Sequence, residues 1–410
     1  MRILGVPRHN REGISHVWIL PMPSNDKQTG YHIETELGHA GRDPMTYDGV
    51  VNPPVYHAST ILSPNLASYH NPDAYGRTGT TTTRAAEQAA AILEGGEQAV
   101  SFPSGLAAVA GALLPFLSAG DHILVADNIY SPTRRFCDVV LKRFGVVTEY
   151  FDPMSGSAVQ ELFRPETRLV YFESPGSQSF EVMDVPSVCA VAREHNVLAI
   201  MDNTWSAGFY FKPFEHGVDV VVQAATKYFS GHADAMLGFV ISSKEYGRKI
   251  KSTATQFGTC AGPDVCYIGL RGVRTLGVRL PRHYENALKI AEWLTGRPEV
   301  DTVLHPALES CPGHEFWKRD FTGASGLFGV VLKPATNAGI TDMVDGLQLY
   351  GLGDSWGGYE SLLVPTHLGG NRTATEWQYE GPSFRIHAGL ENVDDLIADL
   401  GEGLDRLTRA

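Results

Sequence analysis

Two short stretches place a charged side chain directly after an apolar run. Lys227 in "AATKYFS" and Asp202 in "AIMDNTW" both stand there. A lysine held in a cleft loses hydration, which lowers its pKa and frees the neutral amine to act as a nucleophile or base. A buried carboxylate needs a cationic or hydrogen-bonding partner. Each residue also has an ordinary interpretation, a solvated lysine or an Asp that caps a helix or turn.

Further residues could hold the rest of a ligand. Ser104 and Gly105 in "FPSGLAAVAG" stand where a strand turns into a helix, and free N–H groups of a first helical turn bind anions. Tyr130 in "NIYSP" could cover a planar ligand, and Arg77 and Arg385 could each hold an anion bidentately. A plain helix start, a tyrosine at the edge of the core and surface arginines are the alternatives.

These requirements converge on one ligand. The lysine amine would react with an aldehyde, and the carboxylate would pair with a ring nitrogen. The tyrosine would stack on a ring face, and the helix start with an arginine would bind a phosphate. Pyridoxal 5'-phosphate has all four. A serine-hydrolase elbow is excluded because Phe102 replaces its first glycine. No GxGxxG follows the first predicted strand, which disfavours NAD. His232 and Asp234 lack a third ligand, so no metal is predicted.

From about Glu97 short apolar runs alternate with amphipathic ones, which predicts an α/β fold with a mostly parallel sheet. In such a sheet ligands bind beyond the carboxyl ends of the strands, where the candidate residues stand. The seven predicted strands are "QAVSF", "HILVADN", "VVTEYFD", "RLVYFES", "VLAIMDNTW", "VDVVVQAAT" and "LGFVISS".

After about Ser252 the pattern changes to that of a smaller α+β domain. The helical pattern "LPRHYENALKIAEWLTG" is expected to start at, or be kinked by, Pro281. Strand-like "LFGVVLK", the loop "GLGDSWGGYESLLVPT", strand-like "SFRIHAG" and a closing helix "NVDDLIADLGEGLDRL" follow. We therefore predict an N-terminal arm over 1–78, a cofactor-binding α/β domain over 79–273 and a C-terminal α+β domain over 274–410.

Composition limits the partners. The chain has 410 residues, a net charge of -13 and no Lys/Arg cluster, which disfavours nucleic acid. No apolar stretch approaches the roughly 20 residues that cross a bilayer. Five scattered cysteines without a CxxC pair, and first thirty residues without a secretory pattern, favour the cytoplasm. We expect a small-molecule substrate. The Pro-, Gly- and Thr-rich arm, which turns into a helix at about Thr83, indicates a homo-oligomer.

From "GRDPMTYDGVVNPPVYHAST" to the last helix, the sequence resembles the cystathionine-metabolising family of pyridoxal-phosphate enzymes, which have fold type I, as in aspartate aminotransferase. The resemblance implies that Lys227 is the Schiff-base lysine, that Asp202 faces the pyridine nitrogen and that Tyr130 stacks on the ring, with Lys227 and Tyr130 as catalytic candidates. It also implies the remaining binding residues: Gly105, Leu106 and Thr226 for the phosphate, Tyr75 and Arg77 reaching the phosphate from a neighbouring subunit, and Ser355, Trp356 and Arg385 for the substrate. A dimer-interface site and a tetramer would follow.

The reaction implied is β-elimination of L-cystathionine to homocysteine, pyruvate and ammonia, a step of methionine biosynthesis. Trp356 matches the β-lyases of the family, whereas the γ-enzymes have a small aliphatic residue there, and Ala224 replaces a serine common in the γ-enzymes. Thr78 stands where the β-lyases have a second arginine, so cysteine or its S-conjugates are further expected substrates. The alternatives are γ-elimination or γ-replacement on the same scaffold and a non-catalytic regulator that binds the cofactor.

Overall fold

The computed structural model describes residues 30–69, 75–369 and 372–407. The described residues from His32 onward form one compact unit. Of the predicted N-terminal arm over 1–78, residues 1–29 and 70–74 lie outside the described part. None of the helices in the described ranges is long and apolar enough to span a bilayer.

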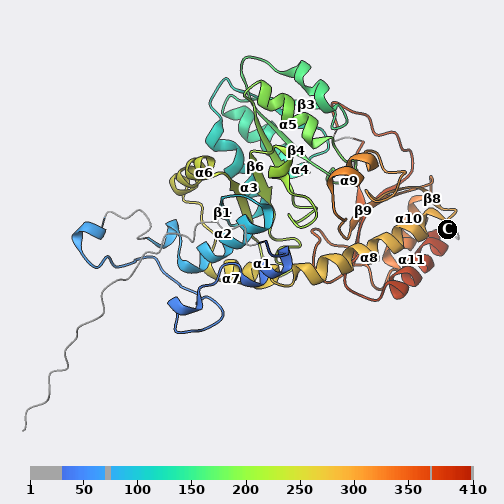
Figure 1. The fold of residues 1–410 in the computed structure, drawn as a ribbon. Helices are drawn as coiled ribbons and strands as arrows, with labels where there is room; N and C mark the ends of the chain where they lie inside the picture. Colours follow the sequence, from blue (N-terminus) through green and yellow to red (C-terminus); the bar gives the residue numbers. More distant parts are fainter. Residues whose placement is uncertain (1–29, 70–74, 370–371, 408–410) are drawn as a thin grey trace, which may run out of the picture. The chain divides into compact units, whose positions relative to one another are not determined.

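A seven-stranded sheet is the centre of the larger half of this unit (Figure 1). Its order is β1-β7-β6-β5-β4-β2-β3, and β7 runs antiparallel to both of its neighbours while the rest of the sheet is parallel. The predicted strand number and mostly parallel sheet are confirmed. The strands are β1 (Gln98–Phe102), β2 (His122–Ala126), β3 (Val147–Phe151), β4 (Thr167–Glu173), β5 (Leu198–Asp202), β6 (Val220–Gln223) and β7 (Gly238–Ser242).

Helices flank this sheet (Figure 1). Helix α2 begins at Thr81, two residues before the expected start at about Thr83, because Thr80 and Thr83 form a reciprocal capping box. It ends at Gly95, whose φ of 81° suits glycine. The helices are α1 (Ile33–His39), α2 (Thr81–Glu94), α3 (Gly105–Leu113), α4 (Ser131–Arg135), which continues as a π-helix over Phe136–Leu141, α5 (Val185–Glu194), α6 (Lys244–Gln256) and α7 (Pro263–Val273).

A second sheet of four antiparallel strands, in the order β10-β11-β9-β8, confirms the smaller α+β half. Helix α8 begins at Leu276 and contains Pro281, so the expected start at Pro281 is wrong, and the alternative of a kink at Pro281 stays a prediction. The sequence patterns also missed β8 and β10. The elements are α8 (Leu276–Thr295), β8 (Val300–Leu304), α9 (His314–Asp320), β9 (Leu327–Leu332), α10 (Asn337–Asp345), β10 (Leu362–Thr366), β11 (Ser383–His387) and α11 (Val393–Leu407).

Each sheet has its own hydrophobic core. One core lies mainly around the seven-stranded sheet, and a second, formed by residues from Ala287 to Leu407, lies between the small sheet, α8, α10 and α11. Two cores support a two-domain division, and the boundary between residues 273 and 274 stays a prediction.

A buried network ties the end of α2 to the ends of β5 and β6. The carboxylate of Glu94 accepts from the amides of Asn203 (2.8 Å) and Gln223 (2.7 Å). Burial raises the pKa of Glu94 to about 7. Because the folded pKa is raised, the stability that Glu94 contributes is fully present below its ordinary pKa of 4.5 and is lost as the pH rises to about 7.

We therefore expect Glu94→Gln to raise the free energy of unfolding at about pH 8 by about 1–3 kcal/mol and to flatten its dependence on pH. The glutamine fits because Gln223 Oε1 has no hydrogen-bond partner among the described residues and can accept from the new amide. Urea unfolding at about pH 5 and pH 8 measures the effect, with the exposed Glu161→Gln as control. An equal pH slope in Glu94→Gln and the wild type would contradict this expectation.

Candidate functional site

Strand order brings the predicted chemistry to one edge of the large sheet. Strands β6, β5, β4 and β2 are consecutive neighbours that run parallel, and their carboxyl ends lead to Lys227, Asp202, Glu173 and Tyr130. The sequence separates these residues by up to about a hundred positions. The sheet therefore assembles one candidate site from four strand ends.

Lys227 is half-buried in the loop after β6. Its Nζ donates to Ser355 Oγ (2.6 Å) and lies 5.1 Å from the centre of the Trp356 ring. Burial, followed by the charge of Arg385, lowers the pKa of Lys227 to about 8. A substantial fraction of this amine is therefore neutral near physiological pH and able to attack a carbonyl or accept a proton.

Asp202 ends β5 with its side chain held by the next turn. Asp202 Oδ1 accepts from the N–H (3.0 Å) and the hydroxyl (2.5 Å) of Thr204, whose oxygen also accepts from the N–H of Ala224 (2.9 Å). Burial raises the pKa of Asp202, while the Thr204 bonds and Lys227 act against that rise. Thr204 thus orients the carboxyl and links it to the loop of Lys227.

Glu173 lies beside Asp202 because the two residues are paired in the register of β4 and β5. Its Oε2 accepts from the N–H of Tyr130 (2.9 Å). Burial, and next the charge of Asp202, raise the pKa of Glu173 well above its ordinary value. Two adjacent buried carboxylates cannot both ionise cheaply, so we expect Glu173 to hold the proton and Asp202 the charge.

The loop before β10 lies directly against Lys227. Ser355 has a φ of 79°, and its carbonyl accepts from the Arg385 guanidinium (3.0 Å). A Cβ at Gly357, whose φ is 87°, would lie 2.7 Å from the N of Tyr228 and 2.8 Å from the carbonyl carbon of Lys227, so only glycine fits. The predicted substrate residues Ser355, Trp356 and Arg385 are therefore brought together with the lysine.

The first turn of α3 offers an anion site close to the loop after β6, which carries Lys227. Ser104 caps the helix by accepting from the N–H of Ala107 (3.1 Å), and the N–H groups of Gly105 and Leu106 have no preceding turn to bond. A Cβ at Gly105 would lie 2.7 Å from that of Ala224, which shows how closely the helix start approaches the strand end. The site can hold a phosphate.

Thr226 lies in the loop after β6, next to Lys227, but its hydroxyl already makes hydrogen bonds within the chain. It donates to the carbonyl of Leu237 (3.2 Å) and accepts from the N–H of that residue (3.0 Å). The expected role of Thr226 toward a phosphate would need its hydrogen to turn away from the carbonyl.

Tyr130 begins the turn into α4 and is 44% exposed, which leaves a ring face available. Tyr75 is also exposed, at 46%, and the Arg77 guanidinium donates to the carbonyl of Thr255 (2.8 Å) and lies 5.4 Å from the centre of the Tyr75 ring. Within this chain these contacts join Tyr75 and Arg77 to each other and to α6.

These residues fit pyridoxal 5'-phosphate. The chain brings together an amine of lowered pKa, a buried carboxyl oriented by Thr204, an exposed tyrosine ring, free N–H groups at a helix start and an arginine above the site. Each matches one functional group of the cofactor or of an amino-acid substrate.

His232 and Asp234 are exposed, and no group of three His, Cys, Asp or Glu side chains in the described ranges could share a metal ion.

The sequence interpretation assigned no role to three residues of this site. Thr204 and Glu173 stand at strand ends that the pattern did mark. The bond of Thr204 to Asp202 is local, whereas the bond of Glu173 to Tyr130 joins the ends of two strands. Asp354 precedes Ser355. Burial lowers the pKa of both Lys227 and Arg385, and the charge of Asp354 acts against that lowering. The "DSW" motif was the available signal for Asp354, since a carboxylate next to predicted substrate residues acts on nearby cations.

Cofactor attachment should depend on the ionisation of Lys227. We expect its rate to rise with pH and to level off above about pH 8, because only the neutral amine attacks an aldehyde. Arg385→Gln should move the midpoint up, since Arg385 lowers the pKa of Lys227, and Asp354→Asn should move it down. Stopped-flow absorbance of apoenzyme mixed with cofactor measures the midpoints. The explanation fails if both variants share the wild-type midpoint.

Comparison with known proteins gives consistent results. A family model described as Cys/Met metabolism PLP-dependent enzyme matches residues 34–405. A Rhizobium johnstonii protein provisionally named cystathionine beta-lyase is 48% identical, over 90% of this chain and 95% of that protein. Cystathionine beta-lyase MetC of Escherichia coli is 42% identical, over 92% of this chain and 98% of that protein. The crystal structure of cystathionine gamma-lyase from Lactobacillus plantarum, complexed with L-serine, is similar with a TM-score of 0.85 and 31% identity, over 92% of this chain and 100% of that one. The predicted fold type I is confirmed.

Proposed function

The chain belongs to the Cys/Met metabolism PLP-dependent enzymes, and on that premise we propose that it is a carbon–sulfur lyase that cleaves L-cystathionine by β-elimination. The products would be homocysteine, pyruvate and ammonia. The relatives named cystathionine beta-lyase support this proposal. The single observation that carries it is the confinement of Lys227 Nζ between Ser355 Oγ and the Trp356 ring.

Each residue of the site has a separate proposed role. Pyridoxal 5'-phosphate, when bound, withdraws electrons from the Cα of the attached amino acid. Lys227 would hold the cofactor and, once released, accept the Cα proton at Nζ. Asp202 would keep a charge opposite the pyridine nitrogen, and Tyr130 would cover the ring. Arg385 would bind the substrate α-carboxylate bidentately, beside Ser355.

Protons and electrons balance over the proposed steps. The Cα proton passes to Lys227, the Cβ–S bond breaks with its electron pair going to sulfur, and the thiolate takes a proton to give homocysteine. Water then converts the three-carbon remainder to pyruvate and ammonia. No oxidant or reductant is required.

The Trp356 ring favours β- over γ-elimination. A γ-elimination needs a second deprotonation, at Cβ, so the lysine must reach two carbons. Here Nζ is bonded to Ser355 and bordered by Trp356, which itself packs 5.3 Å from the Tyr228 ring. The amine therefore has little room to move along the substrate.

A keto-acid assay tests the proposal. Purified holoenzyme is given cystathionine, cysteine and an S-alkyl cysteine side by side, and the keto acid is identified by mass. Pyruvate is expected from each. 2-Oxobutyrate from cystathionine would favour the γ-enzyme alternative, and no keto acid from any substrate would favour the non-catalytic regulator.

Thr78 sets the expected substrate range. It is half-buried, and its hydroxyl donates to the carbonyl of Tyr75 (2.7 Å), so it offers no cation for the distal carboxylate of cystathionine. Thr78→Arg is expected to lower KM for cystathionine by about tenfold, the order of one charge-assisted contact, and to leave KM for cysteine unchanged. Equal changes in both KM values would contradict the role of this position.

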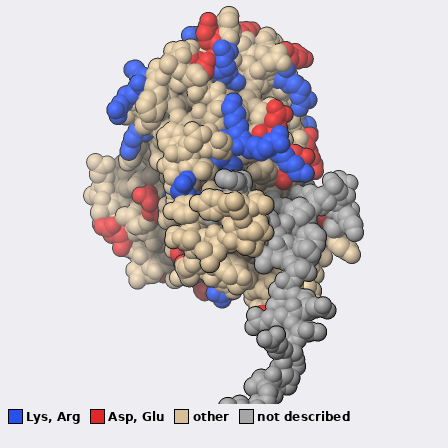
Figure 2. Space-filling model, turned by 90° about the vertical axis from the view of Figure 1, so that its left-hand side faces the viewer, with Lys and Arg blue, Asp and Glu red and all other residues tan. Residues whose placement is uncertain are grey.

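We propose that a second copy of the chain completes the site. Residues 49–69 contain no Lys, Arg, Asp or Glu, and Figure 2, which shows the side of the molecule that carries this segment in Figure 1, has a tan area below its charged side chains. The exposed apolar residues of the segment are Val50 (58%), Val51 (56%), Tyr56 (47%), Leu62 (88%), Leu66 (80%) and Tyr69 (68%). Such a surface favours burial against a partner. Tyr75 and Arg77, a few residues along, would then reach the neighbour's phosphate site.

The proposed assembly is a dimer of dimers, and sedimentation of the holoenzyme would measure it. We also propose a cytoplasmic location. Four of the five cysteine thiols, Cys137, Cys189, Cys266 and Cys311, are buried with raised pKa values, which suits a compartment where thiols stay reduced.

A further inference from the structure

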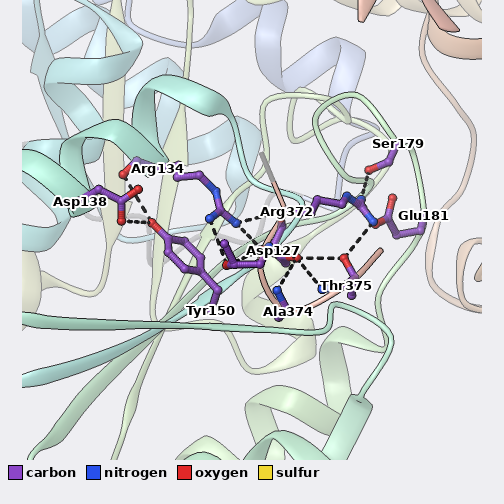
Figure 3. A network of polar contacts seen from close by, with 10 residues as sticks. Asp127, Arg134, Asp138, Tyr150, Ser179, Glu181, Arg372, Ala374 and Thr375 are labelled. Carbon is purple, nitrogen blue, oxygen red and sulfur yellow. Dashed lines mark hydrogen bonds and ion pairs between the residues drawn. The ribbon is translucent and has the colours of Figure 1, made fainter. Parts of the chain in front are cut away.

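The turn between β2 and α4, which presents Tyr130, is closed by a buried ion pair. The Asp127 side chain is fully inaccessible and pairs with Arg134, seven residues later (Figure 3). The Arg134 guanidinium also donates to the carbonyl of Asp127 (3.3 Å) and lies 3.6 Å from the centre of the Tyr150 ring. Residues 127–134 therefore form a turn whose two ends are fixed to each other.

The same carboxylate holds a second part of the chain, residues 372–375 between β10 and β11, here termed the 372–375 segment. Asp127 Oδ2 accepts from the N–H groups of Thr373 (3.1 Å), Ala374 (2.9 Å) and Thr375 (2.8 Å) and from the Thr375 hydroxyl (2.9 Å). Figure 3 shows these donors converging on one oxygen. Asp127 thus joins the Tyr130 turn to a segment about 246 positions away.

A second buried ion pair fixes the other side of the 372–375 segment. Arg372 donates to Glu181 Oε1 and to Ser179 Oγ, both at 2.5 Å (Figure 3). The Arg372 and Glu181 side chains are only 10% and 7% exposed. Glu181 lies in the loop after β4, outside the Tyr130 turn, and this pair anchors the segment to that loop, whose Ser177 N–H donates to the carbonyl of Asn128 in the turn (2.9 Å).

Apolar packing would join these surfaces at a lower desolvation cost than four buried charges. Burial alone would raise the pKa of Asp127, but the N–H and hydroxyl donors of the segment outweigh burial and hold the pKa below its ordinary value. The carboxylate is therefore charged at neutral pH. Directional bonds of this kind fix a geometry, which is the best-attested role of buried polar groups.

The bonds of Asp127 connect two predicted parts of the site, the ring of Tyr130 and the strand of Arg385. Tyr130 lies within the turn, and the 372–375 segment leads into β11, which begins at Ser383 and carries Arg385. We propose that Asp127 is a positioning residue of the active site, since its one carboxylate sets the Tyr130 ring and the Arg385 strand relative to each other. The roles of Tyr130 and Arg385 in this inference rest on the proposed function.

The test compares Asp127→Asn with Glu181→Gln as the matched control. Asparagine keeps one acceptor, but it turns an NH2 toward the donors of the segment and removes the charge opposite Arg134. We expect amide hydrogen exchange at residues 373–375 to become at least about tenfold faster, and the cofactor to leave the holoenzyme about tenfold faster. Glu181→Gln should speed exchange in the segment but leave cofactor release within about twofold of the wild type.

The proposal is overturned if cofactor release from Asp127→Asn equals that of the wild type, or if Glu181→Gln speeds it equally, because either result would limit Asp127 to holding the segment. Should Asp127→Asn fail to fold, Arg134→Gln removes the ion pair of the turn and the bond from Arg134 to Thr373 Oγ1 (3.3 Å), while the bonds of Asp127 to Ala374 and Thr375 stay. It should then speed cofactor release while exchange at Ala374 and Thr375 stays slow, and unchanged release would overturn the proposal. A wild type that makes no pyruvate would refute the proposed function yet leave exchange and cofactor release readable.

Discussion

Lys227→Ala is expected to lose at least about 10³-fold in turnover and to lack the visible absorbance of lysine-linked cofactor. The substitution removes the one amine that the described contacts place between Ser355, Trp356 and the charge of Asp202. The cofactor would still be retained through its phosphate and ring contacts. Activity and cofactor content should therefore separate, with a folded protein that binds cofactor without the covalent link.

Lys142→Ala is the matched control, because this lysine is exposed and remote from the strand ends of the site. Small amines added to Lys227→Ala should restore part of the rate, since a diffusible base can occupy the space left by the side chain. The assignment of Lys227 would be wrong if Lys227→Ala turned over at the wild-type rate, or if the control lost as much activity.

Much of this site could be predicted from the sequence because its residues follow apolar strands. A charged side chain is costly in the middle of a buried strand, so Asp202 marks the last residue of β5, and Lys227 follows the end of β6 at Gln223 by four residues. Likewise, Ser104 and Gly105 closely follow strand β1, so the anion site at the start of α3 could be predicted from the sequence. The lowered pKa of Lys227 was also expected from burial, although the contribution of Arg385 depends on the second sheet.

The remaining features depend on contacts that no local pattern contains. Strand β10 was interpreted as the end of the loop "GLGDSWGGYESLLVPT", yet pairing with β11 makes it a strand. The bonds of Asp127 to residues 373–375 join segments about 246 positions apart, and a strand-terminal Asp by itself predicts only a turn. Pro281 looked like a helix start, but packing carries α8 through it.

Asp202→Asn is expected to lower kcat about 10²- to 10³-fold, with a smaller effect on cofactor affinity. Asparagine can still accept from Thr204 through its oxygen, so the turn should survive, while the negative charge opposite the pyridine nitrogen is lost. That charge matters most as negative charge develops on the substrate, so the loss should fall on kcat rather than KM. Steady-state kinetics of the enzyme saturated with cofactor measure the separate changes in kcat and KM.

Glu173→Gln tests whether the loss of kcat in Asp202→Asn comes from the lost charge or from altered hydrogen bonds between the two carboxyl groups. Glu173 is paired with Asp202 across the two strands, and its strongly raised pKa favours the neutral form, so we expect the glutamine to change neither charge nor size. Its amide oxygen can still accept from the N–H of Tyr130, and we expect a loss below about tenfold. If Glu173→Gln lost as much kcat as Asp202→Asn, the proton would be on Asp202 and the ionised carboxylate of this pair would be Glu173.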